Sequence, residues 1–180
     1  NNTVFDIFQD KEKRFWVATF GGINILTPEK SAQSPARPFG EDSFAITVLR
    51  GGKDIPSDML LTIEEDSKGN LWFGTGDAGV FTIKKSKDGK VGEVFRYNFF
   101  NGFPSNMVWK IFSESKTGDL WFGTAESGLV RFRSDSAKYG FVTYDVHNGL
   151  PNNQVLCLLQ DNERNLWMGT NGGGLCKLQG

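Results

Sequence analysis

One short pattern recurs four times along the 180-residue chain, and it constrains the fold more than any other feature of the sequence. Each copy centres on a tryptophan, and these tryptophans are 56, 49 and 46 residues apart: Trp16, Trp72, Trp121 and Trp167. The last three copies read Asn/Asp-Leu-Trp-Phe/Met-Gly-Thr, and the first departs to Arg-Phe-Trp-Val-Ala-Thr. Self-similarity at a period of this size is typical of solenoids, propellers and other arrays of one repeated unit.

The tryptophan segment has the character of a strand that is buried on both sides. In residues 71–75, alternation places Leu71 and Phe73 on one face and Trp72 and Gly74 on the other. Both faces are therefore apolar or small, which is typical of strands that are covered on both sides. We accordingly expect Trp72, Trp121 and Trp167 to be buried at equivalent positions of the repeat core.

The rest of the repeat divides into further short strands. The turn from Asp66 to Gly69 has Asp first and Gly fourth, which suits a type I hairpin turn with a bulge. Apolar runs such as 107–112 precede the tryptophan strand, runs such as 128–132 follow it, and a weaker strand such as 94–97 ends the repeat. Each repeat thus predicts four strands.

The fold class follows from these strands. No segment has a 3.6-residue hydrophobic period long enough for the helix of a parallel crossover, which leaves antiparallel sheets stacked face to face. The sequence predicts an all-β protein, a β-propeller of four repeats of about 46–56 residues with four-stranded antiparallel blades. A small residue two positions after each tryptophan fits a crowded place where blades converge: Ala18, Gly74, Gly123 and Gly169.

The four repeats make one propeller segment over residues 1–180. We expect blades at about 3–50, 58–99, 106–145 and 153–180, with the last strand of the fourth blade missing. Fifteen strands of sixteen predict an arc of a larger propeller rather than a closed ring, with apolar end faces that favour association. A Pro/Ser-rich insertion at 28–43 accounts for the longest spacing, and we interpret it as a surface loop, with a loop that overhangs a binding face as the alternative.

The repeat resembles that of the two-component regulator propeller family, whose pattern is an apolar strand, Asp, a turn, Gly-Asn-Leu-Trp-Phe-Gly-Thr and then Gly-Leu. The Asn-Gly-Phe/Leu-Pro loops at 101–104 and 148–151 are also similar to that family, whereas Ser115 replaces the family's Asp in the third repeat. The resemblance implies a periplasmic or extracytoplasmic sensor segment of a bacterial hybrid regulator, with a membrane anchor and a histidine kinase elsewhere in the parent chain. It further implies neighbouring propeller repeats and recognition of glycans or their breakdown products.

Charge and composition exclude several partners. The formal net charge is −1, so the chain has no broad positive field for nucleic acid or anionic lipid. No stretch approaches the ~20 apolar residues of a membrane span, so we expect no membrane contact by this segment. The only two cysteines, Cys157 and Cys176, fall in the first and third strands of one blade, about 10 Å apart by strand spacing, which predicts two buried thiols and no disulfide.

Few residues offer catalysis or metal binding. His147 is the only histidine, so a triad or a His-based metal site would depend on it alone, with Asp145 on the same face of an extended strand. The acidic run from Glu64 to Asp66 is split between two faces and a turn, which favours a structural role. We therefore predict no catalytic residue, no metal and no cofactor.

The loops offer a binding surface instead. In a propeller the loops that join consecutive blades share one face with the loops that follow the tryptophan strands, and loops on a rigid scaffold often carry function. Amides and carboxylates on this face suit hydrogen bonds to a neutral or weakly cationic polyhydroxyl ligand, although many of them also suit turn geometry. The predicted ligand-binding residues are Asp77, Asn106, Glu126, His147, Asn153 and Asn171.

Three functions remain open on the sequence. The first is a segment that senses a small molecule or an oligosaccharide for a two-component regulator. The second is a propeller enzyme resembling streptogramin lyase, a family that needs a catalytic histidine and a metal site. The third is a scaffold for protein interaction, including a homodimer.

Overall fold

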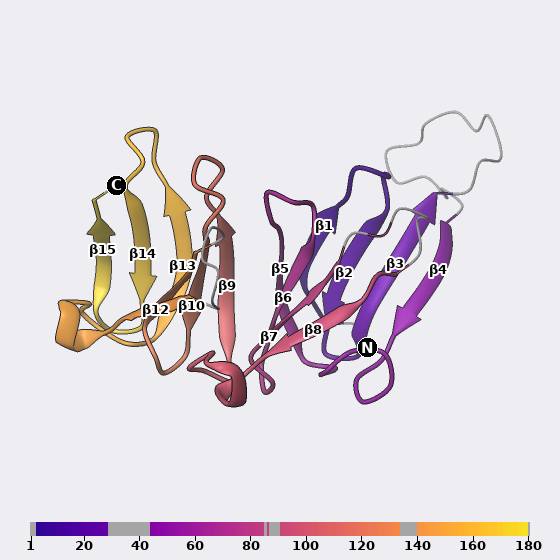
Figure 1. The fold of residues 1–180 in the computed structure, drawn as a ribbon, viewed down its shortest axis with the longest axis horizontal. Coiled ribbons are helices and arrows are strands. Elements are labelled where there is room, and N and C mark those ends of the chain that lie inside the picture. The colour runs from indigo at the N-terminus through magenta and orange to yellow at the C-terminus, as the bar shows by residue number, and fades with distance from the viewer. Residues whose placement is uncertain (1–2, 29–43, 85, 87–90, 134–139, 180) are drawn as a thin grey trace.

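The computed structural model describes residues 3–28, 44–84, 86, 91–133 and 140–179. The predicted insertion at 28–43 lies outside the described residues except for its first residue. The described chain forms four antiparallel sheets and two short 3-10 turns, so the all-β prediction and the four repeats are confirmed (Figure 1).

Each sheet is one repeat, and its strands pair in the order in which they occur in the chain. The first blade is β1 (Val4–Gln9), β2 (Phe15–Thr19), β3 (Gly22–Pro28) and β4 (Phe44–Leu49). The second is β5 (Leu60–Glu65), β6 (Leu71–Thr75), β7 (Val80–Ile83) and β8 (Val94–Tyr97). The third is β9 (Val108–Ser113), β10 (Leu120–Thr124), β11 (Leu129–Phe132) and β12 (Phe141–Tyr144), and the fourth is β13 (Val155–Gln160), β14 (Leu166–Thr170) and β15 (Gly174–Leu178).

The blades stack through two different faces. We call the face that carries the strand's tryptophan the tryptophan face, and the face that carries the residue after it the reverse face. Trp16 on blade 1 packs against Phe73 of blade 2, and Trp72 of blade 2 packs against Phe122 of blade 3. Trp121 of blade 3 packs against the reverse face of blade 4. The tryptophan face of each blade thus buries the reverse face of the next.

In blades 2 and 3 the stacking requires a glycine two positions after the tryptophan. A Cβ on Gly74 would lie 2.7 Å from Thr62 Cγ2 and 3.0 Å from the carbonyl oxygen of Val108 in the next blade. A Cβ on Gly123 would lie 2.8 Å from the carbonyl oxygen of Val155, again in the next blade. A side chain at either glycine would therefore push two blades apart.

A carboxylate fastens the tryptophan of three blades to its own hairpin turn. Asp10, Asp66 and Asp161 each accept a hydrogen bond from the indole Nε1–H six residues later, at 2.8, 3.0 and 2.7 Å. In the last of these, hydrogen bonds from the Asn165 side chain and the Trp167 indole lower the pKa of Asp161 to about 2. The aspartate that the turn pattern singled out therefore also orients the core tryptophan.

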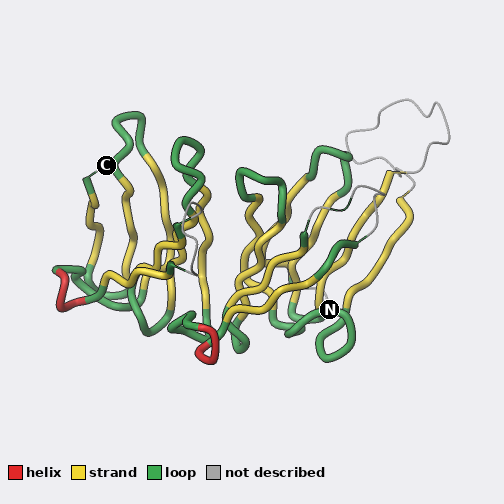
Figure 2. The backbone as a smooth tube through the Cα atoms, viewed as in Figure 1, coloured by secondary structure: helices red, strands yellow, loops and turns green. Residues whose placement is uncertain are grey.

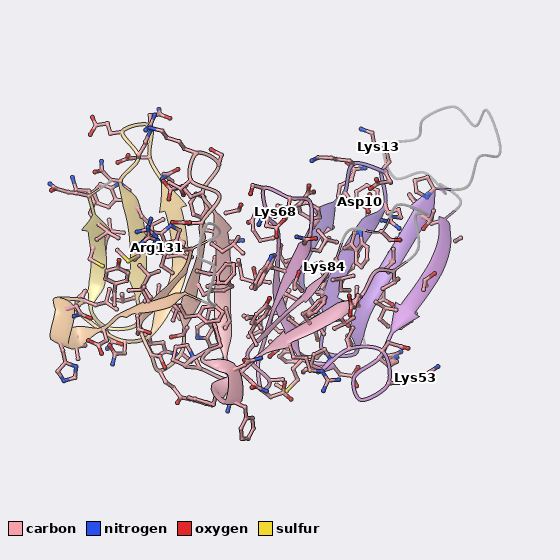
Figure 3. All side chains as sticks on the ribbon, in the orientation of Figure 1. Asp10, Lys13, Lys53, Lys68, Lys84 and Arg131 are labelled. Carbon is pink, nitrogen blue, oxygen red and sulfur yellow. The ribbon has the colours of Figure 1, made fainter. Side chains whose placement is uncertain are left out.

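The third blade replaces this arrangement. Ser115 stands where the other blades have aspartate, and the Trp121 indole donates instead to Glu114 Oε2 at 3.4 Å. The guanidinium of Arg131 lies 5.1 Å from the Trp121 ring and donates to Asp119 Oδ2 at 2.7 Å (Figure 3 labels Arg131). A displaced carboxylate thus holds this indole, and a cation lies over the ring as it does at Trp16 and Trp167.

The four blades form an open row. The first and fourth blades lie at opposite ends of the molecule, and the innermost strands β1, β5, β9 and β13 are neighbours in that order (Figure 1). The arc that the strand count predicted is therefore the observed shape of the described residues.

The two end faces of this row are uncovered. On the tryptophan face of blade 4, Leu159 is 66% exposed and Leu175 is 68% exposed, and Trp167 is only partly buried. Cys157 is exposed on the same face, so the prediction of two buried thiols is wrong for this residue. Trp167 also differs from the three buried tryptophans, because no described blade covers it.

We predict that the stability cost of losing a tryptophan depends on whether a blade covers it. Trp72→Ala should cost about 3–5 kcal/mol, as other buried aromatic truncations do, because the indole is 3% exposed and stacks on Tyr97 at 5.1 Å. The matched change Trp167→Ala removes the same hydrogen bond to an aspartate but much less buried area, so its cost should be clearly smaller. Denaturant unfolding followed by circular dichroism measures both, and equal costs would contradict the stacking described here.

Candidate functional site

One edge of the row collects two sets of loops, and we call it the loop face. The loops that join consecutive blades, at 50–59, 98–107 and 145–154, contact the short turns that follow β2, β6 and β10. The backbone N–H of Gly79 donates to the carbonyl of Asn106 at 2.8 Å, and Gly128 donates in the same way to Asn153. The two 3-10 turns lie on this edge (red in Figure 2).

The opposite edge consists of hairpin turns. Lys13 and Lys68 lie there, whereas Lys53 lies on the loop face (Figure 3). Ion pairs order part of the turn edge: Lys11 Nζ lies 3.1 Å from Glu65 Oε1, and Arg14 Nε lies 2.7 Å from Asp10 Oδ2. Some of its charged groups, including Lys11 and Arg14, therefore have partners within the fold.

The joining loops share one construction. The 3-10 turns Phe99–Asn101 and Val146–Asn148 are each capped in a reciprocal manner, by Asn98 with Asn101 and by Asp145 with Asn148. A glycine with φ of +94° ends each turn, a backbone conformation that favours glycine. The Asn-Gly pairs in these loops are therefore structural.

A groove of about 290 Å³ opens on the loop face of blade 2. Two of the predicted binding residues, Asp77 and Asn106, line it together with Arg96 and the exposed rings of Phe99 and Phe100. Phe99 is 58% exposed and Phe100 is 99% exposed. The groove thus combines a carboxylate, an amide, a guanidinium and an aromatic surface.

Asp77 is held in place through one oxygen. The buried hydroxyl of Ser57 donates to Asp77 Oδ1 at 2.5 Å, while the Ser57 oxygen accepts from the backbone N–H of Met59 at 2.8 Å. Among the described residues Ser57 is the only hydrogen-bond partner of this carboxylate. The second oxygen, Oδ2, therefore remains available to a ligand.

Asn106 differs from its counterparts in the other loops. Asp58 Oδ1 accepts from Gly51 N–H at 2.8 Å, and Asn153 Oδ1 accepts from Val146 N–H at 2.9 Å, so both side chains anchor their own loop. The side chain of Asn106 makes no such bond in the described part of the chain, and it is exposed in the groove.

The remaining predicted residues do not reach this groove. Glu126 occupies on blade 3 the position that Asp77 has on blade 2, and Asn171 donates its Nδ2–H to Gln154 Oε1 at 2.6 Å. Asn153 anchors its loop as described above. The six residues are therefore spread along the loop face, and only two of them meet in one site.

His147 is exposed and close to one acidic group. Its side chain is 86% exposed, and its Nδ1 lies 3.4 Å from Asp145 Oδ1. Although desolvation opposes the shift, hydrogen bonds from the backbone and side chain of His147 hold the pKa of Asp145 below its usual range. No set of three His, Cys, Asp or Glu side chains within the described ranges is arranged to hold a metal ion.

A second group of charged residues lies on the inner strands of three blades. Asp6 Oδ2 accepts from Thr62 Oγ1 at 3.1 Å and from Ile63 N–H at 2.9 Å, and Lys110 Nζ lies 3.9 Å from the same oxygen. Burial raises the pKa of Glu64 to about 7, although the nearby charge of Lys110 lowers it. The contacts of Asp6 join blade 1 to blade 2, and Lys110 extends them to blade 3.

Sequence reasoning missed Arg96, Phe99 and Phe100, which line the groove. The signal that could have found them is a comparison of the repeats with one another. The position of Arg96 is occupied by Val48 in blade 1 and by Thr143 in blade 3. The two phenylalanines stand where the first joining loop has two glycines.

The fold and the loop face together define a propeller-type repeat protein. Sequence comparison agrees, because the model of the two component regulator propeller family matches residues 1–21, 54–77 and 149–172. Each matched segment contains the tryptophan strand of one blade, so the first, second and fourth blades are similar to the repeat of that family. No curated protein matches the sequence.

Solved structures with the same fold come from B. thetaiotaomicron. The extracellular domain of a protein described as the hybrid two component system BT3049 superposes with a TM-score of 0.71 at 24% identity, over 98% of this chain and 23% of its own. The extracellular domain of BT4673, described as a one component system, gives a TM-score of 0.75 at 22% identity, over 99% of this chain and 24% of its own. The chain thus spans about a quarter of the length of the structures it matches. Neither helix in the described part of the chain is long or apolar enough to cross a membrane.

We predict that Glu64 makes the stability of the fold dependent on pH. Its pKa is about 7 in the folded chain and 4.5 as the ordinary value, so the folded state holds more protons between these two values. The stabilisation that the raised pKa of Glu64 gives to the folded state is fully present below about pH 4.5. It is lost as the pH rises through 7, which lowers the free energy of unfolding by up to about 3 kcal/mol. Glu64→Gln should therefore be more stable than the natural chain at pH 8 and equally stable at pH 4.

Urea unfolding at both pH values measures this effect. Glu93→Gln makes the same change of charge at an exposed position and serves as the control. A free energy of unfolding for Glu64→Gln that is lowered at pH 8 would show that the carboxylate is stabilising when charged.

Proposed function

We propose that the chain is an extracytoplasmic ligand-sensing segment of a two-component signal-transduction regulator and that it binds an oligosaccharide on its loop face. The family match supports the regulatory context. The solved structures of the same fold are extracellular domains of signalling proteins, which supports a location outside the cytoplasm. The binding role rests on the groove of blade 2.

The observation that carries this proposal is that the Asn106 side chain does not anchor its loop, whereas the side chains at the equivalent positions do. The side-chain oxygens of Asp58 and Asn153 each accept a backbone hydrogen bond that anchors the loop, while Asn106 presents an exposed amide. Both the amide and Asp77 Oδ2 face solvent on a backbone that is fixed by hydrogen bonds of other residues. Such preorganised polar groups bind with little loss of conformational freedom.

The chemistry of the groove favours a sugar over an apolar ligand. Hydroxyl groups can donate to Asp77 and can both donate to and accept from the amide of Asn106. The apolar face of a sugar ring can pack on the exposed rings of Phe99 and Phe100, which would otherwise leave aromatic surface in water. A polyhydroxyl ligand therefore satisfies each kind of group in the site.

A lyase-like enzyme has less support. Such an enzyme would depend on His147, and this side chain lies in a capped 3-10 turn with Asp145 as its one ion-pair partner among the described residues. The family match is to a regulator propeller, which favours a sensing role. We therefore propose a non-catalytic function for this segment.

A role in association has its own support. The uncovered tryptophan face of blade 4 carries Leu159 and Leu175, and the uncovered reverse face of blade 1 carries Ile7 and Ile46, which are 60% and 65% exposed. The three joints inside the chain each pair these two kinds of face. We propose that neighbouring propeller repeats of the parent protein cover the ends, and that a homodimer covers them when the chain is isolated.

We predict that two asparagines at equivalent positions have opposite roles. Asn106→Ala should abolish or greatly weaken oligosaccharide binding and leave stability unchanged, because its side chain holds no loop. Asn153→Ala should lower the free energy of unfolding by about 1 kcal/mol, the typical cost of a lost hydrogen bond, and leave binding unchanged. An oligosaccharide array followed by calorimetry with the retained sugar, together with urea unfolding, measures both properties. Retained binding in Asn106→Ala would contradict the groove as the site.

We also predict that the isolated chain self-associates through its ends. Replacement of Leu159 and Leu175 by lysine should shift the chain toward the monomer, because each change puts a charge into the apolar face. Sedimentation velocity over a range of concentrations measures the shift. Replacement of the exposed Leu156, which is the unpaired residue in the bulge of β13, is the control. A natural chain that stays monomeric at all concentrations would contradict the prediction.

A further inference from the structure

The repeats serve as references for one another, and most loop-face residues recur with the same role. Tyr97 and Tyr144 end the fourth strand of their blades, and the capped Asn-Gly turn follows in both. Ser57 and Ser105 each use their hydroxyl within the loop, in contact with the backbone of a methionine two residues later. These features explain how the loops keep their shape.

Blade 2 departs from the common pattern at Arg96, Phe99 and Phe100. The counterparts of Arg96 are an uncharged valine and threonine, and those of Phe100 are Gly52 and His147. The groove is lined by all three departures, together with Asn106. The loop-face residues in which blade 2 differs from the other blades are therefore concentrated in this groove.

Arg96 has no charged partner in the part of the chain that the structure describes. Its backbone carbonyl accepts from the Asn101 side chain at 2.6 Å, which fixes the chain at this point. Its guanidinium is exposed, and it pairs with no acidic group among the described residues, including Asp77 in the same groove. By contrast, Arg14 and Arg131 of the neighbouring blades are paired with Asp10 and Asp119.

An unpaired guanidinium in a binding groove selects for an anion. Its planar fork of N–H donors matches the oxygens of a carboxylate or a sulfate, and such bonds are stronger than those between neutral groups. Asp77 in the same groove repels an anion but accepts hydrogen bonds from hydroxyls. One ligand that satisfies both residues carries hydroxyls together with one separate anionic group.

We infer that the groove of blade 2 takes an acidic oligosaccharide, whose carboxylate or sulfate is bound by Arg96. This inference rests on the proposed function and adds the charge of the ligand to it. Arg96 is then the specificity-determining residue, while Asp77 and Asn106 bind the hydroxyls.

The test uses the full chain and pairs of probes. An array of uronic acid oligosaccharides, sulfated oligosaccharides and their carboxyl-reduced or desulfated counterparts is followed by calorimetry with the retained pair. We expect the acidic member to bind at least tenfold more tightly than its neutral counterpart, with weaker binding at high salt. The uronic acid and sulfated arms distinguish the two sources of the anion.

Two variants assign the effect to Arg96. Arg96→Gln should weaken binding of the acidic probe about tenfold to a hundredfold and leave binding of its neutral counterpart unchanged. Lys53→Gln makes the same change of charge on the preceding joining loop, away from the groove, and should bind as the natural chain does. Both positions are exposed, so circular dichroism should report unchanged folding.

The possible results test the acidic ligand and the proposed oligosaccharide binding separately. If neutral probes bind as tightly as acidic ones, or if Arg96→Gln has no effect while Asn106→Ala abolishes binding, the acidic ligand is wrong and the sensing groove stands. If no oligosaccharide of either kind binds, both are overturned.

Discussion

The contact between the tryptophan face of one blade and the reverse face of the next is the interaction on which the rest of the structure depends. No single sheet here could fold alone, because both of its faces are apolar. The glycine two positions after Trp72 and Trp121 lets the next backbone approach, and in three blades the aspartate of the hairpin turn fixes the indole by a hydrogen bond of about 2.7–3.0 Å. In the third blade, where Ser115 replaces this aspartate, the indole donates to Glu114 instead. The loop face depends on these joints, because they fix how each blade lies against the next.

Much of this architecture could be predicted from the sequence, because it is repeated. The period identified the blades, and the predicted strands at 71–75 and 94–97 agree with β6 and β8. The hydrogen bond between Asp66 and the Trp72 indole was not predicted. The sequence pattern indicates a turn at Asp66 and a buried strand at Trp72, but it does not indicate that the two side chains meet. Trp167 and Cys157 were expected to be buried, but burial depends on the neighbour that covers a face, which a repeat pattern does not specify.

The candidate site could be predicted from the sequence only in part. Asn and Asp on the loop face could be recognised as polar loop residues, but the same residue types form turns and caps. Only the hydrogen bonds separate Asn153, which anchors a loop, from Asn106, which does not. Arg96 lies near the end of a strand that the sequence predicts only weakly, and its place in the groove follows from the three-dimensional path of the loop after it.

The strand order has a consequence for how the molecule folds. Every sheet pairs strands that follow one another in the chain, and no blade borrows a strand from another among the described residues. Except for the insertion between β3 and β4, pairing therefore closes only short loops, so the entropy of loop closure is small and the contact order is low for an all-β protein. Folding can then begin at an interior blade and spread outward one blade at a time. Unfolding runs in reverse, so hydrogen exchange should be fastest in blades 1 and 4 and slowest in the two blades that are covered on both faces.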